Sequence, residues 1–201
     1  MNIYTFNGQA LTNDGKWLKE KYVEPTEVTI GSQVWSTKPW NFTDGGEGIY
    51  VASGDYTAAW STLTGTIPTT YLYTADAITR IISSIPAGWH LPTEAEINTL
   101  WSNLPGSTDT DKAQSVFTTD QPYRSGYSAT NASGLDMWSL YANNNNVYIF
   151  DYTSVKMWIA KTASDGRYYC EFGTSYKTAD NYETYGWTPA SAYQVRLIKD
   201  S

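Results

Sequence analysis

Residues 88–97 constrain the fold of this 201-residue chain more than any other segment. Thr93 is followed three residues later by Glu96, which is the spacing of a capping box, where each side chain satisfies a free backbone N–H at a helix start. Pro92 favours an extended conformation for the residue before it. The segment therefore predicts that an extended chain enters a helix at Thr93.

The residues after this start carry the spacing of one apolar helix face. Four apolar residues follow at intervals of three and four, namely Ile97, Leu100, Trp101 and Leu104. A Pro-Gly pair at positions 105–106 then ends the pattern. The spacing predicts a helix over residues 93–104. His90, the one histidine of the chain, precedes this helix, and we expect a hydrogen-bonded structural residue there rather than a catalytic one.

The same segment resembles the signature of the Fibrobacter succinogenes major paralogous domain family, in which Gly-Trp-His-Leu-Pro opens a helix. Further segments resemble the family in the family's own order, at residues 28–35, 40–41, 71–74, 130–135, 156–162 and 193–200. The resemblance covers about residues 27–200. It implies a C-type lectin-like α+β fold, with two helices flanking small antiparallel sheets and a long, loop-rich second half.

The cysteines depart from that family. Its members commonly carry cysteines where this chain has Ile85 and Leu197, so the framework disulfide is missing. Cys170 is the single cysteine, which excludes any intrachain disulfide. The formylglycine-generating enzymes, which share a related fold, depend on paired reactive cysteines, so we do not expect that activity. Cys170 is expected to be a small core residue.

Composition narrows the class of partner. Aromatic residues make up 15% of the chain, charged residues only 16%, and the net charge is -7. Nucleic-acid binding relies on Lys and Arg that neutralise phosphates, so neither nucleic acid nor an anionic membrane is an expected partner. No apolar run is long enough for a transmembrane helix. The first residues lack the pattern of a secretory signal, which together with the missing cysteines favours synthesis in a reducing cytosol; a trimmed signal is the alternative.

Elsewhere the pattern predicts a first helix over residues 74–83, with Ala75, Ile78 and Ile82 inward. Residues 26–35 read as one strand, residues 40–70 as a long stretch with at most short strands, and residues 105–121 as a surface loop. Short strands are expected at residues 138–141, 147–152, 156–162, 167–173 and 193–198. The Asp-Gly pair at 165–166 predicts a hairpin between two of them.

Residues 1–24 lie outside the resemblance and are interpreted as an attachment segment, followed by a lectin-like domain over residues 25–201. A short strand, a turn at residues 7–8 and two helical turns at residues 16–22 are expected there. Whether this segment packs on its own domain or docks into another subunit stays open. The candidate docking residues are Ile3, Tyr4, Phe6, Trp17, Leu18 and Tyr22.

A candidate recognition surface lies in the second half, at a polar turn around residues 141–146 and in the ring-rich stretch 173–188. Tyrosine supplies rigid contact area with a hydrogen-bonding tip, and its ring can stack on a sugar. The alternative is that these rings pin the loop to their own domain. The candidate ligand-binding residues are Tyr141, Asn143, Asn144, Asn145, Tyr176, Tyr182, Tyr185 and Trp187.

No cofactor, metal or catalytic residue is expected. Zinc and iron sites prefer His and Cys, which are nearly absent. Calcium is the open alternative, with oxygen ligands from Asp44, Glu47 and Asp55, or from Asp109 and Asp111. A catalytic triad would have to use His90. A glycosidase would need two carboxylates across a cleft, whereas Glu94 and Glu96 serve the helix start.

These features together favour a non-enzymatic binding or structural protein. The expectation is a bacteriophage virion appendage, such as a head or tail fibre, assembled in the host cytoplasm. Residues 1–24 would dock it to other virion proteins, and its lectin-like domain would bind a host-surface glycan or protein, as a homodimer or homotrimer. The alternatives are a bacterial cell-surface or secreted binding protein of the same family, and an enzyme acting on glycans.

Overall fold

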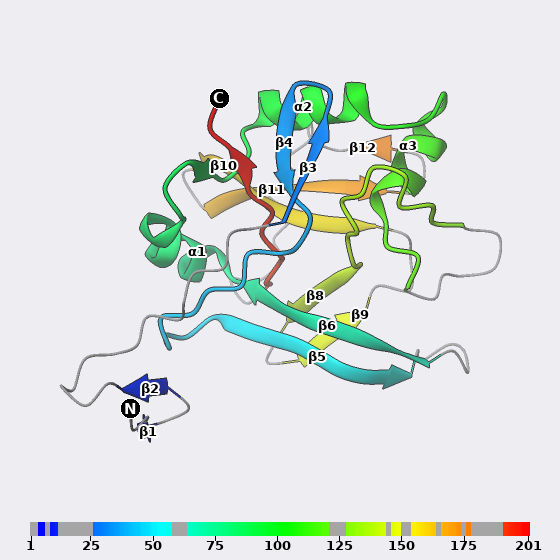
Figure 1. Ribbon diagram of the computed structural model, residues 1–201. Helices are drawn as coiled ribbons and strands as arrows, with labels where there is room; N and C mark the ends of the chain where they lie inside the picture. The colour runs from blue at the N-terminus through cyan, green and yellow to red at the C-terminus, as the bar shows by residue number, and fades with distance from the viewer. Residues whose placement is uncertain are drawn as a thin grey trace.

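A computed structural model describes residues 4–6, 9–11, 26–57, 64–120, 128–143, 146–149, 154–163, 166–173, 176–177 and 191–201 (Figure 1). These residues form a mixed α+β structure of three α-helices and several small antiparallel sheets. None of the helices they form is long and apolar enough to cross a bilayer.

The two helices expected from the sequence are present. Helix α1 spans Ala75–Ile81 and continues as a 3-10 turn, η1, over Ile82–Ser84. Helix α2 spans Glu94–Asn103 and buries Ile97 and Leu100. The inward face of α1 differs from the prediction, because it buries Ala77, Ile78 and Ile81, whereas Ala75 and Ile82 are only partly buried. The tightening of the helix at Ile82 shifts that residue off the buried face.

A third helix, α3, spans Asp109–Val116, where a surface loop was expected. That prediction is wrong. Thr108 and Asp111 form a second capping box, and α3 buries Ala113, Ser115 and Val116. The helix escapes the apolar pattern because its buried face is built mostly from small residues. The expected two-helix arrangement is therefore a three-helix one in the described part of the chain.

A four-stranded antiparallel sheet joins distant parts of the chain. Its order is β3 (Glu27–Ile30), β4 (Gln33–Ser36), β13 (Ile198–Lys199) and β7 (Trp89–His90). The single strand expected over residues 26–35 is wrong, because the chain turns at Gly31, whose φ of 61° suits glycine. The end of the chain thus lies between β4 and β7 and closes the sheet.

A long hairpin formed by β5 (Ile49–Thr57) and β6 (Thr64–Tyr73) replaces the short strands expected in residues 40–70. Its register shifts by one residue between Ala52 and Gly54. Its inner face packs on a second hairpin, β8 (Leu140–Asn143) and β9 (Asn146–Ile149), through Leu72, Leu140 and Ala142. Thr-rich strands of this kind gain stability from cross-strand pairing, which apolar periodicity does not reveal.

A three-stranded antiparallel sheet contains β10 (Val155–Ala163), β11 (Gly166–Gly173) and β12 (Tyr176–Lys177). It confirms the strands expected at residues 156–162 and 167–173 and the hairpin between them. One face of β10 and β11 packs against α2 and α3, and Cys170 lies fully buried there, as expected of a core residue. The strand expected at residues 193–198 reduces to isolated bridges and β13.

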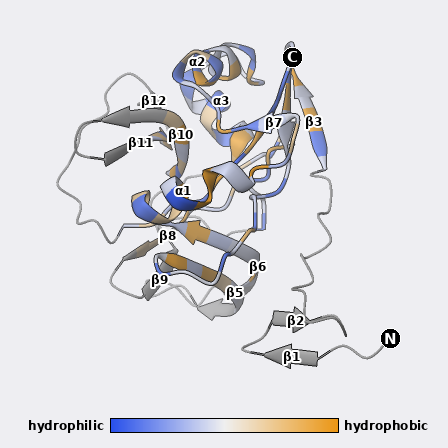
Figure 2. Cartoon of the chain, turned by 90° about the vertical axis from the view of Figure 1, so that its left-hand side faces the viewer, coloured by the Kyte–Doolittle hydropathy of each residue, from blue (hydrophilic) through white to orange (hydrophobic). Residues whose placement is uncertain are grey.

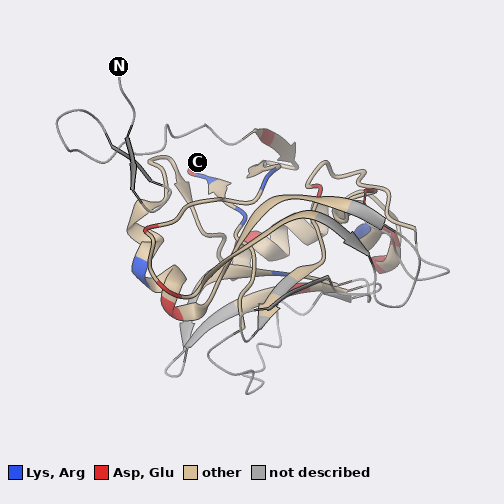
Figure 3. Cartoon of the chain, turned by 90° about the horizontal axis from the view of Figure 1, so that it is seen from below, with Lys and Arg blue, Asp and Glu red and all other residues tan. Residues whose placement is uncertain are grey.

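The elements lie in layers with the longest hairpin at one end. In both Figure 1 and Figure 2, α2 and α3 lie at one end of the main body and the β5–β6 hairpin lies at the other. Few Lys and Arg residues appear over the described part of the chain, and they do not gather into one patch (Figure 3).

At the N-terminus, β1 (Tyr4–Phe6) pairs with β2 (Gln9–Leu11), so the short strand expected there is present. The helix expected at residues 16–22 lies outside the described residues.

Candidate functional site

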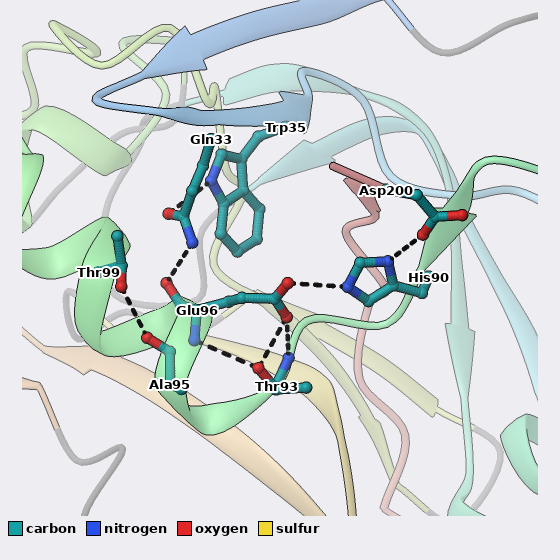
Figure 4. A network of polar contacts seen from close by, with 8 residues as sticks. All are labelled: Gln33, Trp35, His90, Thr93, Ala95, Glu96, Thr99 and Asp200. Atoms are coloured by element: carbon teal, nitrogen blue, oxygen red, sulfur yellow. Dashed lines mark hydrogen bonds and ion pairs between the residues drawn. The ribbon is translucent and has the colours of Figure 1, made fainter.

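The start of α2 is held by the capping box expected from the sequence (Figure 4). The Thr93 hydroxyl oxygen accepts a hydrogen bond from the Glu96 backbone N–H at 3.3 Å. In return, Glu96 Oε2 accepts from the Thr93 N–H at 2.7 Å and from its hydroxyl at 2.8 Å. One carboxylate oxygen of Glu96 is therefore committed to the helix start.

The second oxygen of Glu96 holds His90, the single histidine of the chain. His90 Nε2 lies 2.9 Å from Glu96 Oε1, and Nδ1 lies 2.6 Å from Asp200 Oδ1. Partial burial works against the charged imidazolium, but the hydrogen bonds to Glu96 and Asp200 outweigh it, so the pKa of His90 is raised above its ordinary value. An imidazolium can donate to both carboxylates at once. His90 thus ties β7 to α2 and to the end of the chain.

The same group of contacts reaches β4. Gln33 Nε2 donates to the backbone carbonyl of Glu96 at 3.0 Å, and Trp35 Nε1 donates to Gln33 Oε1 at 3.3 Å (Figure 4). Trp35 is fully buried, and a buried indole N–H needs a partner. We call Gln33, His90, Thr93, Glu96 and Asp200 the helix clamp. Thr93 caps α2, and the other four members join α2 to β4, β7 and the end of the chain, so the clamp has the bonding of a structural joint.

The helix clamp does not have the geometry of a catalytic triad. A nucleophilic triad needs a hydroxyl or thiol that bonds to the histidine. Here the Thr93 hydroxyl bonds to Glu96, and both ring nitrogens of His90 face carboxylates. Cys170 is fully buried in the core. The prediction that His90 is a hydrogen-bonded residue at the helix entry is confirmed.

Two of the carboxylates considered as calcium ligands, Asp44 and Asp111, have other partners. Asp44 pairs with Arg80 through two contacts of 2.6 and 3.2 Å, and Arg80 also donates to the backbone carbonyl of Glu47 at 2.9 Å. The hydrogen bond from Arg80 lowers the pKa of the Asp44 carboxyl. Asp111 caps α3. Among the side chains that the structure describes, no group of three or more His, Cys, Asp or Glu converges as metal ligands.

The candidate ligand-binding residues fall on separate elements. Tyr141 and Asn143 lie on β8, and Asn143 pairs with Asn146 of β9. Tyr176 lies on β12, which contacts α3, whereas β9 contacts β5. Figure 1 shows β8 and β12 apart. The remaining candidates, Asn144, Asn145, Tyr182, Tyr185 and Trp187, lie outside the described residues.

The candidate docking residues are described only in part. Tyr4 and Phe6 lie on β1, which pairs with β2. The other four, Ile3, Trp17, Leu18 and Tyr22, fall outside the residues that the structure describes.

A cluster that the sequence analysis did not single out lies on the other face of β10 and β11. Lys156 pairs across the strands with Glu171, and Trp158 with Tyr169. Lys156 Nζ lies 5.3 Å from the ring centre of Tyr169, 5.8 Å from that of Tyr193 and 3.5 Å from Glu171 Oε2. We call these five residues the aromatic–lysine cluster.

The rings of this cluster pack on one another, and one of them reaches the surface. The ring centres of Tyr169 and Tyr193 are 4.8 Å apart, and those of Trp158 and Tyr193 are 5.2 Å apart. Tyr169 is partly exposed, whereas Trp158 and Tyr193 are buried. Alternation in residues 155–159, with Val, Met and Ile on one face and Lys and Trp on the other, is the signal that could have found this cluster.

The two positions at which members of the resembled family commonly carry cysteines are apolar here and belong to one part of the core. Leu197 is buried in the cluster around Trp40, Tyr73 and Ile78, and Ile85 is partly buried against the same cluster. Apolar packing, and not a disulfide, joins these segments.

No family model, no curated protein and no solved structure matches this chain.

Proposed function

We propose that this chain is a non-catalytic recognition module on a bacteriophage virion appendage, such as a head or tail fibre. One observation carries the proposal: in the helix clamp, both ring nitrogens of His90 and both carboxylate oxygens of Glu96 are engaged in contacts that hold the fold together. The groups best suited to proton transfer therefore hold the fold together. We therefore assign the chain a binding role and not a catalytic one.

The architecture supports a C-type lectin-like domain within this proposal. Helices α2 and α3 pack on one face of the β10–β11 sheet, and β13 brings the end of the chain between β4 and β7. Small antiparallel sheets account for the remaining strands. The additional helix α3 distinguishes the chain from the two-helix arrangement.

The aromatic–lysine cluster supports adhesion to a host-surface glycan or protein. Its partly exposed residue, Tyr169, brings an aromatic ring to the surface, and the Lys156–Glu171 pair lies beside that ring. Aromatic faces and hydrogen-bonding tips are common in protein surfaces that bind polar ligands. Docking through residues 1–24 and homo-oligomerisation complete the proposal, with the virion as the location.

Binding of the purified full chain to host cells and to a panel of envelope glycans tests the adhesive role. Tyr169→Ala is expected to weaken binding by about tenfold, which corresponds to roughly 1.4 kcal/mol. Trp101→Ala is the matched control, because Trp101 stacks on Phe172 from the helical side of the same sheet. Equal binding by the Tyr169→Ala and wild-type proteins would exclude the aromatic–lysine cluster as the contact surface.

Immunogold labelling of purified phage particles tests the location. Labelled particles are the expected outcome. Label confined to the bacterial envelope would instead support the cell-surface alternative, and turnover of a glycan by the purified chain would contradict the non-catalytic assignment.

A further inference from the structure

The two edges of the β5–β6 hairpin are treated differently by the rest of the chain. The edge of β6 is closed by side-chain and backbone partners. Asn41 accepts from the Tyr71 N–H at 2.9 Å and donates to the Thr69 carbonyl at 2.7 Å. Tyr73 exchanges two backbone hydrogen bonds with Tyr193, at 2.9 and 3.0 Å. The amide of Asn41 thus takes the place of a neighbouring strand.

The alternation of a strand then fixes which groups β5 turns outward. The backbone N–H and C=O groups of Thr69, Tyr71 and Tyr73 point away from β5. Those of Thr70 and Leu72 therefore point toward β5, where these two residues pair with Ala52 and Tyr50. The N–H and C=O groups of Ile49, Val51 and Ser53 therefore point to the opposite, outer edge. None of these six groups has a partner among the described residues.

This outer edge is accessible and uncharged. Val51 is 50% exposed and is the exposed large hydrophobic residue of the described surface, and Ser53 is also exposed. Residues 49–54 contain no charged residue and no proline, and the first flanking carboxylates are Glu47 and Asp55. Natural proteins usually protect a sheet edge with charges, proline or a covering segment, because an open edge is a template for another strand. Within the described part of the chain, the edge of β5 has none of these devices.

We propose that the edge of β5 pairs antiparallel with the same edge of a second copy of this chain, about a two-fold axis at Val51. The pattern is self-complementary, because Val51 would face Val51 of the second copy and Ile49 would face Ser53. All six outward groups on each copy would then find partners. The two hairpins would form one four-stranded sheet, in the order β6, β5, β5, β6.

The uncharged centre of the edge is what suits a second copy. Each copy carries a net charge of -7, and residues 49–53, which would pair, carry no charge; Asp55 of each copy would lie opposite Glu47 of the other, so this register leaves the like charges at the two ends of the paired stretch. Val51 pairs with Tyr71 across the hairpin. The dimer would therefore carry a continuous stripe of Tyr71 and Val51 from both copies, and it would cover the exposed Val51 side chain. This inference goes beyond the proposed function, because it selects a dimer and specifies its surface.

Sedimentation velocity of the full chain over a range of concentrations tests the pairing. We expect a monomer–dimer equilibrium for the wild type and at least about tenfold weaker association for Val51→Lys. Thr69→Lys is the matched control, because Thr69 is also exposed on this hairpin but lies on the strand whose edge Asn41 closes. That variant should dimerise like the wild type. Circular dichroism checks that each variant is folded.

Amide hydrogen exchange on the wild type gives an independent readout that needs no variant. Protection of Ile49, Val51 and Ser53 should rise with protein concentration, whereas Tyr50 and Ala52 should be protected at every concentration. A monomer at all concentrations, a trimer, or equal dimerisation of Val51→Lys and wild type would overturn the proposal. So would protection of the three outward amides that appears only with another protein.

Discussion

The helix clamp and the closing segment at residues 194–196 both use polar side chains to join distant parts of the chain, yet only the clamp pairs them fully. In the clamp, both nitrogens of His90 and both oxygens of Glu96 have partners. In the closing segment, Arg196 is 1% exposed and donates through Nη2 to the Asp136 carbonyl at 3.0 Å. Among the residues that the structure describes, its Nε and Nη1 have no hydrogen-bond partner, nor does Gln194 Oε1.

The difference shows where this fold carries an energetic cost. Burial lowers the pKa of Arg196 to about 9, against the favourable charge of Asp136, so the guanidinium is held in an environment that disfavours its charge. Asp136 itself has a φ of 50°, and its backbone N–H donates a hydrogen bond to Asn131 Oδ1 at 2.8 Å. A partly exposed, fully paired network stabilises, whereas a fully buried and partly paired one offsets part of the stability of the core.

The largest effect is expected at Arg196. Arg196→Met should raise the free energy of unfolding by about 1 to 4 kcal/mol. The methionine fills a similar volume, and it removes a buried charge whose donors are only partly paired. Urea-induced unfolding measures the change. Arg80→Met is the matched control; that arginine pairs with Asp44 on the surface, so its loss should cost less than about 1 kcal/mol. Destabilisation by Arg196→Met would remove the contrast between the two regions.

Glu96 should give the next largest effect, in the opposite direction. Glu96→Ala should lower the free energy of unfolding by about 1 to 3 kcal/mol, since it removes both the cap and the contact with His90. Glu96→Gln should cost less, because glutamine can serve a capping box without the charge. Chemical unfolding of the two variants side by side provides the measurement. Equal losses would mean that the charge, and not the cap, carries the effect.

The two capping threonines allow a finer comparison. Thr93→Ala and Thr108→Ala should each lower the free energy of unfolding by about 1 kcal/mol. The loss at Thr93 should be the greater, because Thr93 also orients the glutamate that holds His90, whereas Asp111 at the start of α3 binds only its own turn. Thermal unfolding compares them, and Thr→Ser variants at both positions should recover most of the stability. A larger loss at Thr108 would contradict this order.

The smallest effect is expected from pH. The pKa of His90 is raised in the folded chain, so its contribution is complete below the ordinary histidine value of about 6.5 and is lost as pH rises through the higher folded value. Because the side chain is 36% exposed, the change should stay below about 1 kcal/mol. NMR titration of the imidazole measures the pKa, which Asp200→Asn should lower. An unchanged pKa in that variant would show that Asp200 does not support the charge.

Local signals in the sequence predicted α2 almost to the residue. The capping pair fixed its start, and the spacing of Ile97, Leu100 and Leu104 fixed its buried face. Helix α3 carried a similar cap at Thr108 but lacked large apolar residues on its inner side, so the same rule did not find it. A helix that buries small residues depends on the shape of the surface it packs on, which is not written in its own periodicity.

The long β5–β6 hairpin was missed for a related reason. A strand rich in Thr and Gly becomes a strand when a partner pairs with it, and here the partners include the Asn41 side chain and Tyr193. The candidate recognition residues were placed by composition alone, and the described ones fall on two separate elements. Composition indicates which residues suit binding, but it does not indicate which of them become neighbours.

The sequence by itself determined the start of α2, the absence of any intrachain disulfide and the strand pair around residues 163–166, because each depends on residues within a few positions or on a simple count. Only the tertiary structure decided that His90 meets Asp200 across 110 positions, that Arg196 is buried with unpaired donors, and that β5 keeps an open edge. Those features depend on which distant segments come into contact. Such contacts are selected by the packing of the whole core and not by the preferences of any one segment.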